Sequence, residues 1–398
     1  MRILQIVPSI SLVYGGPSQM VLGLSTALAA QNIDVTILTT DSNGDIGQPP
    51  LDVPLDKPVR QNGYQIRYFR CSPFRRYKFS LKLLQWLNQH ASEFDLAHIH
   101  ALFSPVTTMA ATVARVNNLP YILRPLGTLD PADLRKKKLL KKIYVSLLEK
   151  RNIYRAAALH FTSLEEAKVS ERFGVSTRDL VIPLGVNPPD NIQDEKLVNY
   201  LQSQGIEIKH PVILFMSRIE PKKGLDLLLP ALEKLLAEGI DFQFILAGAN
   251  PQDPNYEAKI RSQIEASPLA KCTKITGFVT GEIKASLLQV ADVFVLPSYY
   301  ENFGIAVAEA MVAGTPVVIS DGVHICQDVA DAKAGWVGSC KIEDMAILIK
   351  SALQNEAERK QRGLNAQELA KKSYSWEAIA TQTIQAYQKI ITYQGVRS

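Results

Sequence analysis

The chain of 398 residues is long enough for two domains of ordinary size, and its 46% hydrophobic and 21% charged residues are typical of a soluble globular protein. It contains no apolar run near the length of about 18 residues that a membrane-spanning helix needs. It also opens without the apolar core and cleavage site of a signal peptide, so we expect a cytoplasmic protein. The four cysteines are scattered, which argues against disulfides and cysteine metal sites.

The net charge of +5 is distributed unevenly along the chain. Residues 1–200 hold 24 Lys and Arg against 17 Asp and Glu, a net charge of +7, whereas residues 201–398 hold 20 against 22, a net charge of −2. A basic amino-terminal half predicts an acidic partner: a nucleic acid, an anionic lipid or a phosphorylated acceptor. Nucleic acid is disfavoured, because aromatic residues do not interleave with the basic runs and no reader motif is present.

Apolar strand-like runs alternate with amphipathic segments through the first half of the chain. The predicted strands are 2–8, 34–39, 65–70, 95–100, 121–124 and 157–162, and the predicted helices are 17–31, 81–91, 105–117 and 134–155. This order predicts a parallel sheet with helices on both faces. The loop after the first strand carries Gly15-Gly16-Pro17, which suits either a plain turn or a close approach of backbone to a ligand, but is not a dinucleotide fingerprint.

A turn-rich stretch at 182–191 separates this half from a second alternation. The predicted strands are 212–216, 242–247, 272–276, 292–296 and 316–319, the predicted helices are 224–238, 257–266, 281–290 and 303–312, and the tail 342–393 is mostly helical. We therefore predict an α/β protein of two Rossmann-like domains, with a linker near 184–210. Ligands of such sheets bind outside the carboxyl ends of the strands, so two facing domains would form a cleft there.

The stretch 292–320 predicts an anion site. A buried strand is followed by a polar turn with Glu301 and then by a helix that carries Glu309. The first amides of a helix lack internal partners, and the helix dipole favours negative charge there. Glu309 lies among apolar residues, where a carboxylate needs a partner that ligand hydroxyls could supply. The alternative is that Glu301 is a loop charge and Glu309 a solvated or capped helix residue.

A second charged motif, Ser-Arg-Ile-Glu-Pro-Lys-Lys-Gly, follows the first strand of the second domain. Its Arg218 and Lys223 flank a proline-containing turn in front of a helix. A fork-shaped guanidinium and a mobile ammonium at the mouth of a sheet suit a diphosphate. Two solvated loop charges are the alternative, but the position in the same predicted cleft as Glu301 favours a ligand.

Taken together, these motifs resemble the retaining glycosyltransferases of family 4, also called glycosyl transferases group 1. The resemblance rests on Arg218 with Lys223, on Gly-Phe-Val at 277–279, and on Glu301 and Glu309 with seven residues between them. Gly15-Gly16, His-Ile-His at 98–100, and the stretches 161–166 and 182–187 are consistent with it. It implies a GT-B fold, in which two Rossmann-like domains face each other across a cleft. It also implies a nucleotide-sugar donor, no required metal, no further cofactor, and retention at the anomeric carbon.

The resemblance also implies a domain assignment and a donor site. Residues 1–190 would bind the acceptor, residues 191–375 the donor, and a helix at 376–398 would return to the first domain. Arg218 and Lys223 would hold the diphosphate, Glu309 the ribose and Glu301 the sugar hydroxyls. Backbone groups would complete the site: Asn302, Phe303, Gly304 and Ile305 at sugar and phosphate, Gly277, Phe278 and Val279 at the base, and Gly16 at the phosphates. The cations would stabilise the leaving diphosphate, which itself would accept the proton of the acceptor.

The acceptor side departs from the family pattern. Arg124 stands where many relatives have a histidine, and it would bind a phosphate or the acceptor instead. His98 is expected to be a core histidine, whereas His100, at the end of its strand, is the candidate for catalysis or for contact with sugar or acceptor. The basic amphipathic helix predicted at 134–148 suits either a solvated face over a core stripe or docking on an anionic membrane.

We therefore predict a retaining, metal-independent hexosyltransferase. It would move a hexose, with glucose the first choice, from a UDP-sugar to a glycan or a lipid-diphosphate-linked oligosaccharide in exopolysaccharide or envelope polysaccharide synthesis. The enzyme would be cytoplasmic, or peripheral on the inner face of the membrane. The alternatives are a UDP-sugar epimerase of the same fold and a non-catalytic sugar-binding protein.

Overall fold

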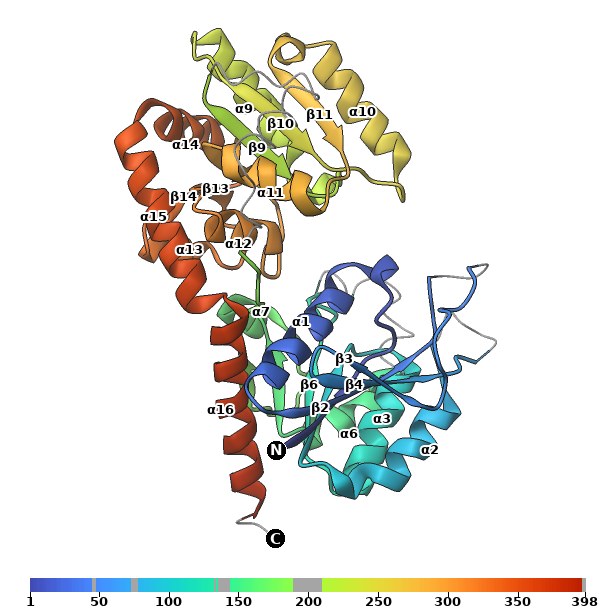
Figure 1. Cartoon of the computed structure of the whole chain (residues 1–398). Coiled ribbons are helices and arrows are strands. Elements are labelled where there is room, and N and C mark those ends of the chain that lie inside the picture. The colour runs from blue at the N-terminus through green and yellow to red at the C-terminus, as the bar shows by residue number, and fades with distance from the viewer. Residues whose placement is uncertain (45–47, 73–77, 132–133, 135–143, 189–209, 396–398) are drawn as a thin grey trace. The chain divides into compact units, whose positions relative to one another are not determined.

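The computed structural model describes residues 1–44, 48–72, 78–131, 134, 144–188 and 210–395. The chain forms two compact units (Figure 1). The first unit consists of Met1–Gly185 and Trp376–Ser398, and the second of Val186–Ser375. The chain thus leaves the first unit at 185, five residues before the predicted boundary at 190, and returns to it at the predicted position, 376. No described helix is both long and apolar enough to cross a bilayer.

The first unit is built on a sheet of eight strands in the order β3-β4-β2-β1-β5-β6-β7-β8. All neighbours are parallel except β3, which runs antiparallel to β4 at the edge. The strands are β1 Arg2–Ile6, β2 Asp34–Thr40, β3 Pro58–Gln61, β4 Tyr64–Phe69, β5 Leu96–His100, β6 Tyr121–Arg124, β7 Ala158–Phe161 and β8 Asp179–Val181. In this unit the sequence pattern missed two strands, β3 and β8, which are short edge strands without a fully buried residue. In the second unit it missed the edge strand β14, Gly335–Gly338.

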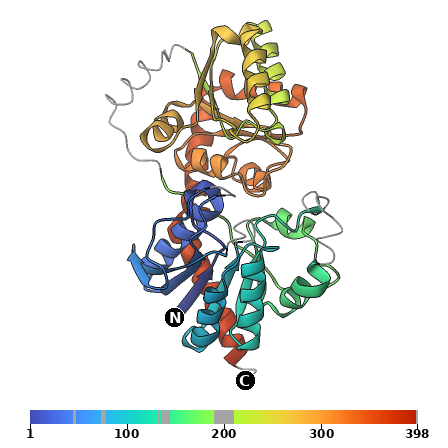
Figure 2. The ribbon, with the colours of Figure 1, turned by 90° about the vertical axis from the view of Figure 1, so that its right-hand side faces the viewer.

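Helices cover both faces of this sheet (Figure 2). The α-helices are α1 Gly16–Ala30, α2 Leu81–His90, α3 Pro105–Val116, α6 Lys150–Arg155, α7 Leu164–Val169 and α16 Trp376–Gly395; shorter turns are η1 Leu12–Tyr14, η3 Ala91–Glu93 and the π-helical turn η4 Val145–Glu149. One face packs on α1 and α16, with Ile3, Leu24 and Tyr387 in its core. The other packs on α2 and α3, with Leu4, Leu83 and Val106. Alternation of Ile3 and Leu4 between the two cores follows from the pleat of a strand.

Helix α16 docks on the first unit through Trp376. A Cβ atom added at Gly23 would lie 2.2 Å from the indole ring, and one added at Gly185 would lie 2.3 Å from it. Glycine at both positions therefore lets the ring pack directly against backbone from α1 and from the chain just before the second unit. Farther along α16, Tyr387 is fully buried beneath the sheet face.

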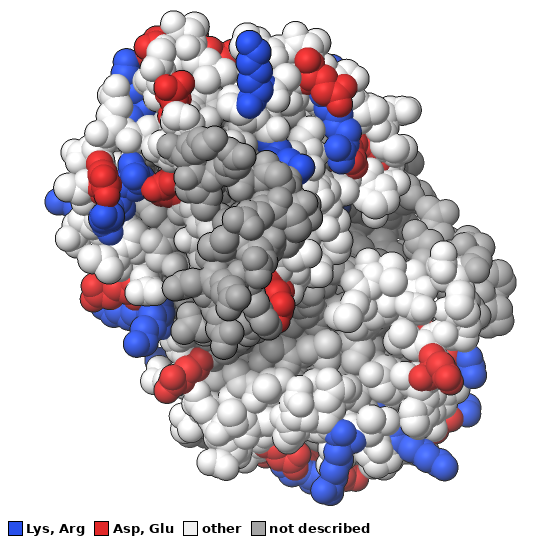
Figure 3. Space-filling model, turned by 45° about the horizontal axis from the view of Figure 1, so that its top comes forward, with Lys and Arg blue, Asp and Glu red and all other residues white. Residues whose placement is uncertain are grey.

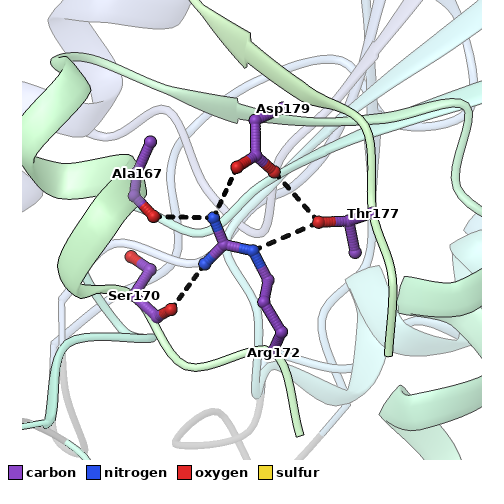
Figure 4. Close-up of polar contacts among 5 residues, drawn as sticks. All are labelled: Ala167, Ser170, Arg172, Thr177 and Asp179. Carbon is purple, nitrogen blue, oxygen red and sulfur yellow. Dashed lines mark hydrogen bonds and ion pairs between the residues drawn. The ribbon is translucent and has the colours of Figure 1, made fainter. Parts of the chain in front are cut away.

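Arg172 organises the connection from α7 to β8 (Figure 4). Its guanidinium donates to the carbonyl oxygens of Ala167 and Ser170 at 2.7 and 2.6 Å. It also donates to the Thr177 hydroxyl at 3.1 Å and to the Asp179 carboxylate at 2.8 Å. These bonds use the planar donor fork of arginine and fix the edge strand β8, whose own sequence carries little strand pattern.

The second unit has a fully parallel sheet of six strands in the order β11-β10-β9-β12-β13-β14. The strands are β9 Val212–Met216, β10 Gln243–Ala247, β11 Thr273–Gly277, β12 Val293–Leu296, β13 Val317–Ser320 and β14 Gly335–Gly338. The helices are α9 Leu225–Ala237, α10 Pro254–Glu265, α11 Gly281–Val290, α12 Ile305–Val312, α13 Cys326–Asp331, α14 Ile342–Gln354 and α15 Glu356–Ser373, with short turns η5 Pro221–Lys223 and η6 Pro268–Lys271. The predicted pair of α/β units with parallel sheets is confirmed.

Each sheet has one point at which the order of its strands reverses. In the first unit it lies between β1 and β5, and in the second between β9 and β12. Loops on the carboxyl side of such a point leave in opposite directions and open a crevice, which is where ligands of doubly wound sheets bind. The fold therefore marks one candidate ligand position in each unit.

Candidate functional site

In the second unit, two loops meet at the carboxyl ends of β9 and β12. The Tyr299 amide donates to the Lys222 carbonyl oxygen at 2.9 Å. Gly224 has a φ of +72°, and a Cβ atom at this position would lie 2.0 Å from the carbonyl oxygen of Pro297. Only glycine fits there, so the loop of Arg218 and Lys223 contacts the loop that leads to Glu301. The structure thus brings together two motifs that lie far apart in the sequence.

Lys223 and Glu301 form an ion pair at this junction. The Lys223 ammonium donates to Glu301 Oε1, and the lysine is buried, with 7% of its surface exposed. Burial lowers the pKa of Lys223 to about 7, and the positive charge of Lys222 acts in the same direction. The Glu301 carboxylate favours the charged form of the ammonium. In the ligand-free chain, the two predicted ligand-binding groups therefore satisfy each other.

Arg218 has a different partner. Its guanidinium lies 2.6 Å from the Glu220 carboxylate, and its side chain is 55% exposed. Glu220 also lies 3.6 Å from the Lys222 ammonium. An exposed ion pair of this kind contributes little stability, so Arg218 can exchange Glu220 for a ligand anion at small cost.

A pocket of about 140 Å³ lies beside this junction. It contains four of the predicted donor residues: Arg218, Phe278, Val279 and Glu309. The other lining residues are Met216, Ser217, Ala247, Gly248, Ala249, Lys284 and Ala306. The Phe278 side chain is 79% exposed at the pocket, and Gly277, with a φ of +75°, ends β11 just before it. A flat aromatic face and backbone edges at such a place suit a planar base.

Glu309 does have the partner that its apolar surroundings require, but that partner is Lys284. The Lys284 ammonium, from α11, donates to Glu309 Oε1, and the two side chains are 32% and 22% exposed. We predicted ligand hydroxyls in this role, and sequence reasoning did not single out Lys284. Its only sequence signal is a single lysine within Ile-Lys-Ala-Ser-Leu-Leu, which is too weak to identify a site residue.

The start of α12 lies between the two carboxylates, as predicted. Gly304 adopts the left-handed conformation with a φ of +82° and caps the helix, which begins at Ile305 rather than at the predicted 303. Phe303 is buried and packs edge-on against Tyr374, with ring centroids 5.2 Å apart. The Glu301 amide donates to the Gly322 carbonyl oxygen at 2.9 Å, which fixes the turn before Asn302. Free amides at the helix start make this turn suitable for an anion.

In the first unit, His100 and Arg124 end β5 and β6 as register partners. Their side chains leave the same face of the sheet, and they are 0% and 3% exposed. His98 is a buried core histidine, because Nδ1 and Nε2 both have hydrogen-bond partners. Gly16 is the first residue of α1, directly after Gly15, whose φ is +66°. Three residues that the sequence did not single out, Gln5, His160 and Tyr387, join this group through hydrogen bonds to His100 and His98.

The loops after β5 and β6 contain strained backbone. Ala101, Phe103 and Leu126 have φ values of +77°, +60° and +57°, which non-glycine residues rarely adopt. The Phe103 amide donates to the buried Glu149 carboxylate at 3.2 Å, from the π-helical turn. Burial raises the pKa of Glu149, against the hydrogen bonds from Thr108 and Phe103. Such strain persists where the surroundings hold it and is concentrated at ligand sites.

The predicted basic helix at 134–148 lies largely outside the described residues, since 135–143 are not described. On the face drawn in Figure 3, described side chains of both signs are interspersed, without a continuous basic patch.

Comparison with known families identifies the chain. Residues 15–185 match the family model "Glycosyl transferase 4-like domain", and residues 199–369 match "Glycosyl transferases group 1". The chain belongs to the group 1 glycosyltransferases. This glycosyltransferase is 30% identical over 224 residues to an uncharacterized glycosyltransferase of Methanocaldococcus jannaschii, over 54% of the chain and about half, 55%, of that relative. It is 28% identical over 397 residues to the phosphatidyl-myo-inositol mannosyltransferase of Mycobacterium leprae, over 98% of both chains.

Solved structures show the GT-B fold of this glycosyltransferase. Anabaena HepE in complex with UDP is 19% identical, with a TM-score of 0.76 over 98% of this chain and 100% of HepE. Sucrose-phosphate synthase from Thermosynechococcus elongatus is 21% identical, with a TM-score of 0.73 over 99% of this chain and 100% of the synthase. The GT-B prediction and the family prediction are both confirmed.

Proposed function

We propose that this glycosyltransferase transfers a hexose, with glucose the first choice, from a UDP-sugar to a glycan or lipid-linked oligosaccharide. The observation that carries the proposal is the arrangement at the carboxyl ends of β9 and β12. Two lysine–glutamate pairs, Lys223 with Glu301 and Lys284 with Glu309, flank the start of α12. A nucleoside diphosphate sugar has groups for three of these side chains: phosphates for Lys223, ribose hydroxyls for Glu309 and hexose hydroxyls for Glu301.

Each part of the donor matches one part of the site. The uracil ring would lie against Phe278 at the pocket, and the ribose hydroxyls would donate to Glu309. The diphosphate would accept hydrogen bonds from Arg218 and Lys223 and from the free amides at the start of α12. The hexose hydroxyls would donate to Glu301. No metal ion enters this scheme, because positively charged side chains meet every phosphate.

Donor binding exchanges partners rather than creating unpaired charges. In the ligand-free chain, Lys223 donates to Glu301 and Arg218 to Glu220. A bound donor would give phosphate oxygens to both cations and sugar hydroxyls to Glu301, so no buried charge is left without a partner. When the bond to the anomeric carbon breaks, negative charge grows on the leaving diphosphate. Arg218, Lys223 and the helix amides would stabilise that charge.

The retaining outcome follows in this scheme from reaction on one face of the sugar. The leaving phosphate accepts the proton of the acceptor hydroxyl, so the site needs no strong side-chain nucleophile. His100 and Arg124 in the first unit would bind the acceptor. We propose that the reaction takes place at the inner face of the membrane. There it would assemble an exopolysaccharide or envelope polysaccharide on a lipid carrier.

Solved relatives support a UDP-linked donor, since HepE has been crystallised in complex with UDP and with UDP-glucose. Two relatives matched over 98% of the chain are named phosphatidyl-myo-inositol mannosyltransferases, which makes a GDP-sugar the natural competitor in a test. Thermal unfolding with UDP-glucose, UDP-galactose and GDP-mannose would rank the donors, because a ligand of the native state raises the apparent stability. We expect UDP-glucose to give the largest shift.

The same protein, incubated with UDP-glucose and a chelator, should slowly release UDP. Binding and turnover of GDP-mannose alone would refute the donor assignment. Formation of an epimerised nucleotide sugar without an acceptor would indicate the epimerase alternative. Binding of free sugars without any nucleotide would indicate the non-catalytic alternative.

A further inference from the structure

A row of buried polar side chains lies beneath α16 at the point where the strand order of the first unit reverses. The row contains Gln5, His98, His100, Arg124 and His160, from the adjacent strands β1, β5, β6 and β7. Register places Gln5 beside His98 and His100 beside Arg124, so their side chains leave one face of the sheet. Tyr387 of α16 reaches into the same row.

The hydrogen bonds of this row run in one direction. The Ile182 carbonyl oxygen can only accept, so His160 Nε2, at 2.9 Å, carries the proton. Burial lowers the pKa of His160 to about 3, so the ring is neutral and its Nδ1 accepts from His98 Nε2 at 3.1 Å. Burial also lowers the pKa of His98 well below its usual range. His98 Nδ1 therefore accepts, and the Tyr387 hydroxyl donates to it at 2.7 Å.

The same logic fixes the state of His100. The single Tyr387 proton is used at His98, so the hydroxyl oxygen accepts from Gln5 Nε2 at 3.1 Å. Gln5 then presents Oε1 to His100 Nε2 at 2.6 Å, and that nitrogen must carry a proton. Burial and the charge of Arg124 lower the pKa of His100 well below its usual range. His100 is therefore neutral, and its Nδ1 is a buried lone pair without a partner among the described residues.

Arg124 supplies the complementary group. Its Nε is likewise buried without a hydrogen-bond partner in the described part of the chain. The buried Glu166 carboxylate acts on its charge, but it accepts from the Thr162 amide and hydroxyl at 2.7 Å and forms no ion pair with Arg124 among the described residues. One acceptor atom and one donor group thus lie at the ends of β5 and β6, next to the strained loops after these strands.

We propose that His100 Nδ1 and Arg124 form a subsite for a ligand hydroxyl, and that Gln5 and Tyr387 are positioning residues that set its polarity. A hydroxyl can donate to Nδ1 and accept from the guanidinium at the same time, whereas an unprotonated phosphate oxygen would bring its lone pair against that of Nδ1. As an acceptor subsite it rests on the proposed function. Both atoms are shielded from solvent, so the hydroxyl reaches them after a shift of the neighbouring loops.

The first test needs no ligand. In the full chain labelled with ¹⁵N-histidine, the six rings can be assigned by substitution and each tautomer read from its ring-nitrogen shifts. We expect a neutral His100 with the proton on Nε2. Tyr387→Phe and, independently, Gln5→Met should change the tautomer population of His100. Tyr393→Phe, which removes an exposed hydroxyl from the same helix, should not. A proton on His100 Nδ1 in the unmodified chain would overturn the proposal.

The second test uses glucose as the hydroxyl probe and inorganic phosphate as the anion probe, both with UDP present. Glucose should shift the His100 Nδ1 resonance while leaving this atom unprotonated. If both ring nitrogens of His100 become protonated when phosphate is added, the site binds an anion. That result would refute the hydroxyl subsite.

Transfer activity gives the third test. His100→Asn keeps an acceptor near the position of Nδ1, whereas His100→Gln reaches only toward Nε2. We expect the Gln variant to transfer about tenfold more slowly than the Asn variant, the effect of one lost hydrogen bond. Affinity for UDP should be the same in both. Equal transfer rates would contradict the subsite. Failure of the unmodified chain to bind any nucleotide sugar would refute the proposed function. The tautomer of His100, which is measured without a ligand, would not be affected by that result.

Discussion

Replacing Glu309 by alanine should separate the folding role of this carboxylate from its binding role. In the ligand-free chain its contact with Lys284 is a partly exposed ion pair, with side chains 22% and 32% exposed. Such pairs contribute about 0.2–1 kcal/mol, so the variant should unfold within a few degrees of the unmodified protein. Glu368→Ala, an exposed glutamate of α15 in the same unit, is the matched control.

The expected loss of donor affinity is much larger. Two ribose hydroxyls that donate to one carboxylate would contribute about 1.5–3 kcal/mol each. Part of this gain offsets a weakening of the ion pair with Lys284, which leaves about 3 kcal/mol. That free energy corresponds to roughly a hundredfold weaker Kd for UDP. Glu368→Ala should leave the Kd unchanged.

Calorimetric titration with UDP and with 2′-deoxy-UDP completes a thermodynamic cycle for the contact between Glu309 and the ribose 2′-hydroxyl. Removal of the 2′-hydroxyl should weaken binding to the unmodified protein by roughly tenfold, the effect of one hydrogen bond to a charged group. In the Glu309→Ala protein, the two nucleotides should bind within about twofold of each other, because the hydroxyl has lost its partner. If the variant still prefers UDP tenfold, Glu309 does not contact the ribose and the orientation proposed for the nucleotide is wrong.

Other variants test the remaining parts of the donor site. Lys223→Ala should lower kcat by about 10²–10³-fold with little change in fold, as expected for a group that stabilises developing charge; full activity would remove Lys223 from the site. Because burial lowers the pKa of Lys223 in the ligand-free chain to about 7, UDP affinity should decrease as the pH rises above about 7, where the ammonium loses its proton. Lys223→Arg should abolish that dependence, and an unchanged pH profile would assign it to another group. Gly224→Ala should destabilise the second unit by about 3 kcal/mol or more in urea unfolding, from strain plus overlap with Pro297, whereas Gly239→Ala, with open space around its Cβ, should cost only about 1–2 kcal/mol. Equal losses of unfolding free energy in the two variants would show that the backbone at Gly224 can move away from Pro297.

Much of the fold could be predicted because buried parallel strands have a strong sequence pattern. β9 reads Val-Ile-Leu-Phe-Met and is wholly buried, and its neighbours are similar apolar runs. β3 reads Pro-Val-Arg-Gln and lies largely exposed at an edge. Its position is set by pairing with β4 rather than by burial of its own side chains, and no local pattern reports such pairing.

The candidate donor site was partly predictable for a related reason. Arg218, Lys223, Glu301 and Glu309 occur in motifs whose spacing is readable, and the parallel fold gathers them at one edge of the sheet. Lys284 occurs in no motif, and only the packing of α11 beside α12 brings it to Glu309. The prediction that ligand hydroxyls satisfy Glu309 could not include a competing side chain whose position depends on tertiary structure.

The two units stabilise their buried polar side chains differently. In the second unit, charges are paired as Lys223 with Glu301 and can be exchanged for a charged ligand. In the first, neutral groups are linked in a directed chain that begins at the Ile182 carbonyl and ends at a His100 lone pair that has no hydrogen-bond partner among the described residues. A chain of this kind transmits polarity, because reversing any bond would leave a buried donor facing a donor. The hydroxyl proton of Tyr387, on α16, therefore determines that His100 Nδ1 is a hydrogen-bond acceptor and that its ligand must supply a donor.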